Sequence, residues 1–414
     1  MFRGVELDFT RPGKPADNGD IESVNGRLRD ECLSVHQFLS LDNAKTIIEA
    51  RRRDDNGAPM RSAFKTILGV VALASCSNPA PTGHPSQVVY QGADGPGTGK
   101  HVVLIAGDHE YRSEELLPAL GRILAQRFGF KASVFFTLDS AGFIQPGSSN
   151  IGGLEALKTA DLLIVGIRFQ DFPPDQMQHI VDYINRGGPV LGLRTSTHAF
   201  QIKSGPFARY SWDYKGVDYP SGFGEQVLGE TWVGHYGTNH EQSSRILPRG
   251  DRADHPIFRG VSDIHVQSGG YKAYPLPGSD VLASGQVLNG MQHDAAVDST
   301  KESLPVAWTR TYRGTNGQEG RVFTTTHGAS EDFLNPGFRR MLVNASLWAL
   351  GMEKVITSDL DVGFVGPFHP VTFDFEGYRR GVRPSDLAGW DSPIMSPYRP
   401  TRDSSSQLTK EKAP

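Results

Sequence analysis

Three stretches of the chain share one pattern, a short apolar run that turns abruptly polar. The runs span residues 101–106, 161–167 and 189–193, and the third leads into the polar cluster RTSTH that begins at Arg194. Short apolar runs bounded by glycine and polar residues are typical of buried strands in a parallel sheet. Because such strands end at one edge of the sheet, where open α/β sheets bind ligands, the polar ends predict a single site.

Helical patterns alternate with these strands. One helix is predicted over 113–128, where Ser113 supplies a cap, and another from Pro173 to residue 185, where a glycine pair follows. The other predicted elements are strands at 132–138, 281–287, 306–311 and 321–326, a short helix at 153–158 and a closing helix at 335–350. This alternation predicts an α/β fold, a parallel sheet with helices on both faces.

Composition narrows the class of protein. The 414 residues give room for one large domain or two, and the formal net charge of −4 gives no argument for a nucleic-acid partner. Cys32 and Cys76 lie in unrelated segments, so neither a structural disulfide nor a cysteine zinc site is expected. No apolar run approaches the roughly 18–20 residues of a membrane-spanning helix.

Residues 1–57 differ in composition from the rest and predict two helical pieces. The stretch LDFTRPGKPADNGDIESVNGRLRDECLSVHQFLS resembles the C-terminal end of the integrase-type (DDE) transposases of insertion sequences. This resemblance implies that Glu22 is the last of three metal-binding carboxylates. Phosphoryl chemistry also needs two upstream aspartates, for which the residues before Glu22 leave no room, so we expect an inactive remnant. A basic, solvated helix pair is the alternative interpretation.

Residues 60–76, MRSAFKTILGVVALASC, have a basic flank, a short apolar run and a terminal cysteine. The spacing resembles a bacterial lipoprotein signal, which implies a lipid on Cys76 and a location in the cell envelope. Such signals are N-terminal, so this hypothesis requires translation to start at Met60. The alternative is a short buried helix in a cytoplasmic fusion protein.

A second resemblance covers about residues 100–375. The motifs GDHEYRSEE, IRFQDFP, PVLGLRTSTHAF, LGETWVGHYG and GRVFTTTHGAS occur in the order seen in ThuA-like (trehalose-utilisation type) proteins. The resemblance implies a flavodoxin-like fold related to the class I glutamine amidotransferases, and a role in carbohydrate metabolism. The amidotransferases carry a nucleophilic cysteine in a G-x-C-x-G turn, whereas the corresponding residues 192–196 read GLRTS, with Arg194 in the cysteine position. Amidotransferase activity is therefore not expected.

Several imidazoles follow strands or glycine-rich turns, including His240. Convergent histidines allow acid/base catalysis at neutral pH or, with a carboxylate such as Glu110 or Glu230, a divalent metal, although no H-x-x-x-H spacing supports the metal. Trp232, Tyr236 and Tyr271 suit either sugar stacking or the core. The predicted catalytic residues are His109, Glu110, Arg194, His198 and His235. The predicted substrate-binding residues are Asp108, Arg112, Arg168, Thr195, Trp232, Tyr271 and His327.

Two departures from the ThuA-like pattern affect these assignments. His327 stands one residue before Gly328-Ala329, where the family commonly has Gly-His, and SGG replaces an Asp-x-Glu before Tyr271. If the family histidine takes part in the chemistry, either His327 substitutes for it from a displaced position or the function differs. Loss of the Asp-x-Glu would remove a metal ligand.

We expect acid/base isomerisation or cleavage of a sugar or keto-glycoside, with His198 or His235 moving the proton. A non-catalytic sugar-binding module is the alternative, and transposition by residues 1–57 the second alternative. The expected partners are a small carbohydrate and, through Cys76, a membrane, with homo-oligomerisation left open. The predicted organisation is an integrase-like remnant (1–57), a signal (60–76), a linker (77–99), a ThuA-like domain (100–353), a C-terminal extension (354–391) and a disordered tail (392–414).

Overall fold

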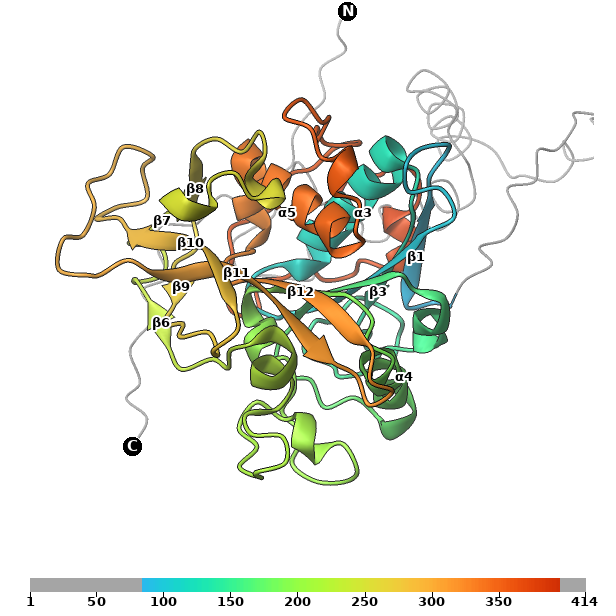
Figure 1. The fold of residues 1–414 in the computed structure, drawn as a ribbon. Helices are drawn as coiled ribbons and strands as arrows, with labels where there is room; N and C mark the ends of the chain where they lie inside the picture. Colours follow the sequence, from blue (N-terminus) through green and yellow to red (C-terminus); the bar gives the residue numbers. More distant parts are fainter. Residues whose placement is uncertain (1–83, 395–414) are drawn as a thin grey trace, which may run out of the picture. The chain divides into compact units, whose positions relative to one another are not determined.

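The computed structural model describes residues 84–394 (Figure 1). The strands and helices predicted for the first half are present within a residue or two of the expected ends. They are β2 (His101–Gly107), α3 (Ser113–Phe128), β3 (Lys131–Phe136), β4 (Leu162–Ile167), α4 (Pro174–Asn185) and β5 (Val190–Leu193). The short helix predicted at 153–158 is present as a 3-10 helix, η3 (Leu154–Thr159).

The sheet has ten strands in the order β1-β3-β2-β4-β5-β12-β11-β10-β7-β8. Neighbouring strands from β3 to β12 (Glu319–Thr325) are parallel, so Val103 of β2 pairs with Ser133 on one side and Leu163 on the other. This parallel centre confirms the predicted flavodoxin-like α/β class. Antiparallel strands extend it: β11 (Leu304–Arg313), β10 (Asp280–Val287), β7 (Ser244–Pro248) and β8 (Ile264–Val266).

The first strand, β1 (Gln87–Gln91), lies inside the stretch predicted as a flexible linker. It pairs antiparallel with β3, and its side chains alternate so that Val88 and Tyr90 are buried. Five residues between glycine- and proline-rich flanks give a weak sequence signal, and the pairing with β3 supplies the missing stabilisation.

Two apolar cores cover the two faces of the sheet, as the alternation along β2 requires. Val102 and Leu104 point to one core, and Val103 and Ile105 to the other. Figure 1 shows α3 and α5 (Pro336–Ala349) on one side of the sheet and α4 on the opposite side. Both faces are therefore closed, and the strand ends are left for function.

The C-terminal extension packs into the core beside α3 and α5. Its residues Val362, Phe368, Leu387 and Ile394 are buried there, and the Tyr90 hydroxyl donates to the Leu387 carbonyl at 2.8 Å. The last three described residues, 392–394, thus belong to a packed segment although a disordered tail is predicted from 392. Residues 395–414, and the integrase-like and signal segments, lie outside the described residues.

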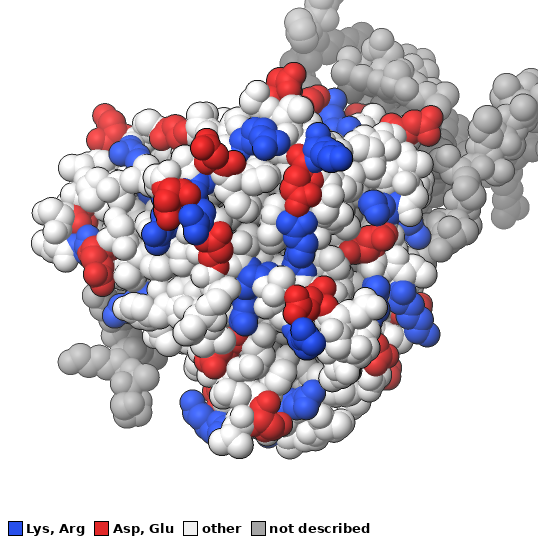
Figure 2. All heavy atoms as spheres, in the orientation of Figure 1, with Lys and Arg blue, Asp and Glu red and all other residues white. Residues whose placement is uncertain are grey.

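Within residues 84–394, no helix is long and apolar enough to cross a membrane. On the face shown in Figure 2, lysine and arginine side chains are interspersed with aspartate and glutamate. This mixture is ordinary for a solvated surface.

Candidate functional site

The polar ends of β2 and β5 are joined by a direct hydrogen bond. The Thr195 hydroxyl donates to Asp108 Oδ2 at 2.7 Å, while Asp108 Oδ1 accepts from the backbone amides of Glu110 and Tyr111. Asp108 therefore shapes the loop after β2 and anchors it to the end of β5, two strands away in the sheet. We call the surrounding group the strand-end site. It comprises Asp108, His109, Glu110, Tyr111, Arg168, Phe169, Arg194, Thr195, His198, Trp212, Trp232, His235, Asn239, Tyr271 and Phe375.

Glu110 and Arg168 form an ion pair across this site. Arg168 Nη1 donates to Glu110 Oε2 at 2.6 Å, and both side chains are 12% exposed. The Arg168 guanidinium lies 5.2 Å from the ring centroid of Phe375, which comes from the C-terminal extension. Sequence reasoning missed Phe375, because an aromatic residue in a polar loop more than 200 residues after Arg168 carries no local signal.

Arg194 occupies the turn after β5 in a left-handed conformation, with φ of 43°. A non-glycine residue in this conformation is strained by about 1–3 kcal/mol. Its side chain is 1% exposed and donates to the carbonyls of Gly269 and Thr326. The guanidinium carbon lies 3.6 Å from the centroid of Tyr111 and 4.8 Å from that of Tyr271. Arg194 is thus a buried support between two tyrosines.

The Tyr111 phenol and the His235 imidazole are in hydrogen-bond contact. The phenol oxygen lies 3.2 Å from His235 Nε2 and accepts a hydrogen bond from Asn239 Nδ2 at 2.9 Å. His235 lies on β6 (His235–Tyr236), which pairs with β9 (Gly270–Tyr271). Burial raises the pKa of Tyr111, and partial burial followed by the Arg194 charge lowers that of His235. Tyr111 stands in a quoted family motif, but its partner could not be read from spacing.

His198 lies in a cluster of aromatic rings. Its ring centroid is 4.9 Å from Phe169, 5.2 Å from Trp232 and 5.7 Å from Tyr271. The side chain is 2% exposed, and burial, followed by the Arg168 charge, lowers its pKa well below the usual value. His198 is therefore neutral at pH 7 and faces rings rather than solvent.

Several polar atoms of the strand-end site are buried without a hydrogen-bond partner in the described part of the chain. They are Nδ1 of His109, Nε1 of Trp212 and Trp232, the Tyr271 hydroxyl, and Nε and Nη2 of Arg194. Buried polar atoms are normally satisfied, so this concentration is typical of a site that a polar ligand completes.

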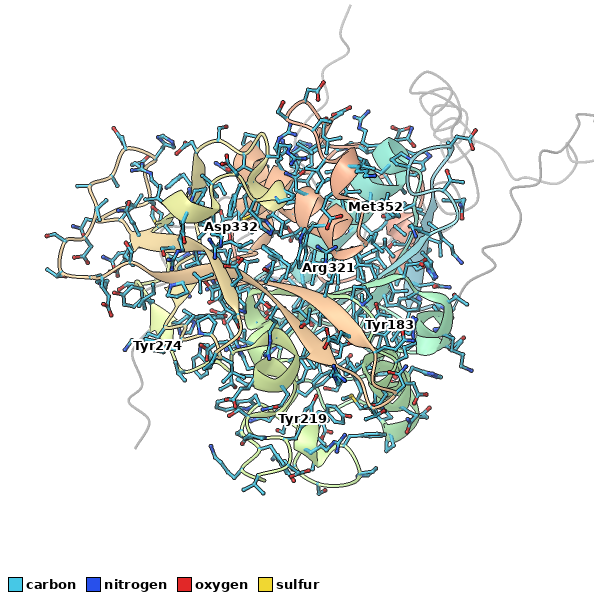
Figure 3. The ribbon with its side chains drawn as sticks, viewed as in Figure 1. Tyr183, Tyr219, Tyr274, Arg321, Asp332 and Met352 are labelled. Atoms are coloured by element: carbon cyan, nitrogen blue, oxygen red, sulfur yellow. The ribbon has the colours of Figure 1, made fainter. Side chains whose placement is uncertain are left out.

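His327 lies behind β9 and has a structural environment. Its Nδ1 is 3.3 Å from the Ser268 hydroxyl, which donates to Asp332 Oδ2 at 2.5 Å. Asp332, labelled in Figure 3, also accepts from the Gly328 and Ala329 amides. Burial, followed by the Arg194 charge, lowers the His327 pKa to about 3. His327 is thus neutral, and its Nδ1 contacts Ser268 while its Nε2 has no hydrogen-bond partner in the described part of the chain.

Comparison with known proteins gives two family matches. Residues 147–349 match the ThuA family, described as Trehalose utilisation, and residues 3–58 match the Integrase core domain. The matched stretch shares its sheet with β2 and β3, which precede it in the chain. Both resemblances predicted from the motifs are confirmed.

Solved structures include two ThuA-like proteins similar to this chain. The protein from Bacteroides uniformis is 15% identical with a TM-score of 0.40, covering 65% of this chain and 98% of its own. The one from Parabacteroides merdae is 15% identical with a TM-score of 0.39, covering 67% and 97%.

The curated relatives match the N-terminal segment. The IS407 31.7 kDa protein of Burkholderia multivorans is 47% identical over 61 residues, 15% of this chain and 22% of that protein. The IS476 39.2 kDa protein of Xanthomonas euvesicatoria is 47% identical over 53 residues, 13% of this chain and 15% of that protein. The chain thus spans about a fifth or less of these relatives.

Not every predicted residue of the ThuA-like region joins the strand-end site. Arg112 is fully buried at the start of α3, where it donates to Glu114 and to the Asp374 carbonyl. The Tyr236 hydroxyl donates to the Glu302 carbonyl instead of joining the ring cluster. His240 stacks on Phe373 at 4.4 Å.

Glu230, a predicted carboxylate ligand for a metal, is hydrogen-bonded to the backbone. Glu230 accepts from the Thr231 and Tyr274 amides, and burial raises its pKa to about 7. Among residues 84–394 no group of three or more His, Cys, Asp or Glu is arranged to hold a metal ion. Glu22 and Cys76 lie outside the described residues.

Proposed function

We propose that the ThuA-like domain binds a carbohydrate at the strand-end site and moves a proton to or from it through Tyr111 and His235. The observation that carries this proposal is the 3.2 Å separation of the phenol oxygen and His235 Nε2. Because Asn239 donates to that oxygen, the phenol proton is free to point at the imidazole. A phenol and a neutral imidazole in hydrogen-bond contact are a suitable acid/base pair at neutral pH.

The same site has groups suited to a sugar. Trp212 and Trp232 are partly exposed indoles 5.9 Å apart, and aromatic faces stack on the apolar faces of sugar rings. The partnerless indole and imidazole nitrogens nearby match the hydroxyl groups of such a ligand. Arg168 and Glu110, each 12% exposed, can bind further oxygens at the rim.

Two reactions of a sugar are compatible with proton transfer by Tyr111 and His235. Removal of a proton from the carbon next to a keto group would give isomerisation or elimination, with the proton passing to His235. Protonation of a glycosidic oxygen by Tyr111 would assist cleavage: water attacks the sugar carbon and loses its proton to His235, while the C–O bond to the protonated leaving group breaks. Neither route needs a protein nucleophile, in agreement with a buried arginine at the nucleophile turn.

The proposal is tested with trehalose and a keto derivative of trehalose as probes. We expect the wild-type chain in D₂O to exchange the proton next to the keto group or to release product, both visible by NMR. Tyr111→Phe and His235→Gln should lower that rate about 10²-fold or more. Tyr236→Phe is the matched control, since its hydroxyl faces the Glu302 carbonyl. Unchanged rates in Tyr111→Phe and His235→Gln would overturn the acid/base proposal.

A sugar-binding module is the second candidate function. Two predicted catalytic groups favour it, because both already have partners within the protein. Glu110 is paired with Arg168, and Arg194 packs against Tyr111 and Tyr271. Binding of a probe sugar without exchange or product, and its loss in Trp232→Ala, would support this function.

We also propose that the chain is anchored to the cell envelope through Cys76 and that the integrase-like segment is inactive in transposition. The mass of the N-terminal peptide from membrane fractions tests the anchor, because a diacylglyceryl group on Cys76 is expected. Metal-dependent DNA strand transfer by the full chain would contradict the second part.

A further inference from the structure

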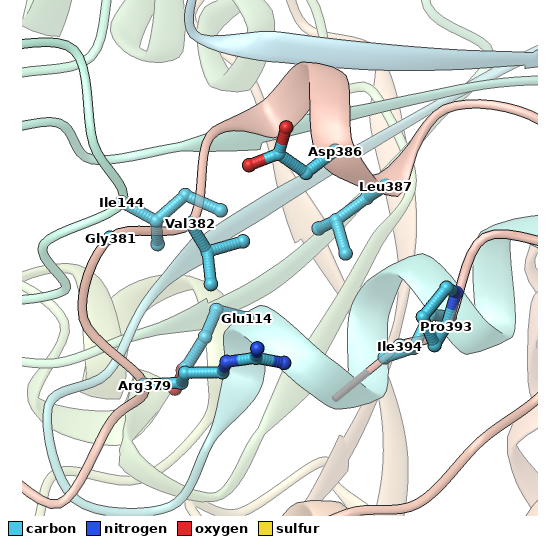
Figure 4. Close-up of a pocket in the computed structure, with 9 residues that line it drawn as sticks. All are labelled: Glu114, Ile144, Arg379, Gly381, Val382, Asp386, Leu387, Pro393 and Ile394. Atoms are coloured by element: carbon cyan, nitrogen blue, oxygen red, sulfur yellow. The ribbon is translucent and has the colours of Figure 1, made fainter. Parts of the chain in front are cut away.

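A second cavity, separate from the strand-end site, lies between the first turn of α3 and the C-terminal extension (Figure 4). Its volume is about 230 Å³. Ile144, Val382, Leu387 and Ile394 contribute apolar side chains, and Leu387 and Ile394 are themselves buried. A cavity with an apolar wall of this kind favours an aliphatic group.

Charged side chains of both signs line the same cavity. Glu114 is 7% exposed; its Oε1 accepts from Arg112 at 3.3 Å, but its Oε2 has no hydrogen-bond partner in the described part of the chain. Arg379 is exposed and lies, in the view of Figure 4, at the same end of the cavity as Glu114. Asp386 adds an exposed carboxylate to the lining, and its Oδ2 accepts from the Arg383 amide. The cavity therefore presents a buried carboxyl oxygen, an accessible guanidinium and one exposed carboxylate.

The surroundings of Glu114 are short of positive charge. The next residue, Glu115, is also buried, and its Oε2 accepts from the Val371 amide while its Oε1 has no partner in the described residues. One buried guanidinium, Arg112, thus faces two buried carboxyls. Burial raises the pKa of both carboxyls, whereas the N-terminus of α3 favours their ionised forms. A cation beside Oε2 of Glu114 would balance this cluster.

We propose that the cavity binds a small zwitterion with an aliphatic side chain, an aliphatic α-amino acid. Its ammonium group bonds Oε2 of Glu114, its carboxylate pairs with Arg379 at the mouth, and its side chain packs on the Val382–Leu387 wall. The arrangement uses the partnerless oxygen, the exposed guanidinium and the apolar lining together. A simple amine would leave Arg379 unused, and a simple carboxylate would leave Glu114 unpaired.

The test is calorimetric titration of the full chain with L-leucine and three analogues. The analogues are 3-methylbutylamine, which lacks the carboxylate, 4-methylpentanoate, which lacks the ammonium, and glycine, which lacks the side chain. We expect leucine to bind most tightly. Each lost charge-assisted contact should weaken binding roughly 10-fold to 100-fold.

Variants assign each charge to its partner. Glu114→Gln should weaken the binding of leucine and 3-methylbutylamine but leave that of 4-methylpentanoate unchanged. Arg379→Gln should weaken the binding of leucine and 4-methylpentanoate but leave that of 3-methylbutylamine unchanged. Arg380→Gln is the matched control, because Arg380 is adjacent but bonds the Tyr378 hydroxyl. If Glu114→Gln does not fold, Val382→Trp provides a second probe: it places an indole in the cavity and should abolish leucine binding.

Three results would overturn the proposal. They are no binding of leucine to the folded chain at millimolar concentration, equal binding of leucine and 3-methylbutylamine, or leucine affinity that survives both Arg379→Gln and Val382→Trp. None of these depends on activity at the strand-end site, so the two proposals can fail separately.

Discussion

Two charged clusters only a few residues apart in the sequence have different chemistry. Glu110, in the loop after β2, has one arginine to itself, and that ion pair keeps contact with solvent. Glu114, in the first turn of α3, pairs with the buried Arg112, and the same charge also acts on the neighbouring buried Glu115. The comparison teaches that charge balance and burial, not sequence proximity, decide whether a carboxylate is neutralised or left available for a ligand.

The largest expected difference between the clusters comes from removing the arginines. Arg112→Met leaves two buried carboxyls without a cation and removes the bond to the Asp374 carbonyl. We expect a loss of about 3–5 kcal/mol in the free energy of unfolding, measured by urea denaturation. A smaller loss of unfolding free energy than in Arg168→Met would contradict this difference between the buried and the solvent-contacting cluster.

Arg168→Met is the matched change in the solvent-contacting cluster. Because both partners are 12% exposed, water can solvate the freed Glu110, and we expect a loss of about 1–2 kcal/mol in the free energy of unfolding. Carbohydrate affinity, measured by titration, should fall about tenfold or more. Unchanged affinity would remove Arg168 from the binding surface.

Glu115→Gln tests the shared cluster through pH. Burial raises the pKa of Glu115 well above 4.5, so the folded state holds a proton that the unfolded state releases. Stability from this group is complete below pH 4.5 and is lost as pH rises toward the raised pKa, by at most about 1.4 kcal/mol per pH unit. Relative to the wild type, the stability of the variant should therefore rise between pH 5 and 8, and the midpoints of urea denaturation measure this difference. A pH-independent difference would contradict this mechanism.

The smallest expected effect concerns the packing that covers Glu114. Tyr90→Phe removes the hydrogen bond from β1 to the Leu387 carbonyl without changing charge. We expect a loss of about 0.5–1.5 kcal/mol in the free energy of unfolding, measured by thermal denaturation. Leucine binding should weaken severalfold while the Tyr111–His235 reaction is unchanged. Equal loss at both sites would mean that the extension supports the whole domain uniformly.

Much of the fold was predictable, but the partners within the site were not. The central strands and α3, α4 and α5 follow from apolar runs, prolines and glycine stops near their observed ends. The predicted Ser113 cap of α3 is wrong, because the Ser113 hydroxyl accepts from the Gly107 and Asp108 amides and α3 has no side-chain cap. Strand β1 and the packed extension were missed, because each is stabilised by long-range pairing rather than by its own pattern. The convergence of the three strand ends followed from parallel topology, whereas Phe375 and Asn239 reach the site through loops of unpredictable course.

The sequence by itself determined the alternation of strands and helices, the ThuA-like and integrase-like matches, and the absence of a cysteine at the nucleophile turn. These are properties of local pattern, periodicity and residue identity. Only the tertiary structure decided that Glu110 pairs with Arg168, 58 residues away, while Arg112 turns to Glu114. The physical reason is that side-chain partners depend on backbone direction at the strand ends. A left-handed Arg112, with φ of 61°, sets that direction in a way that no spacing in the sequence reveals.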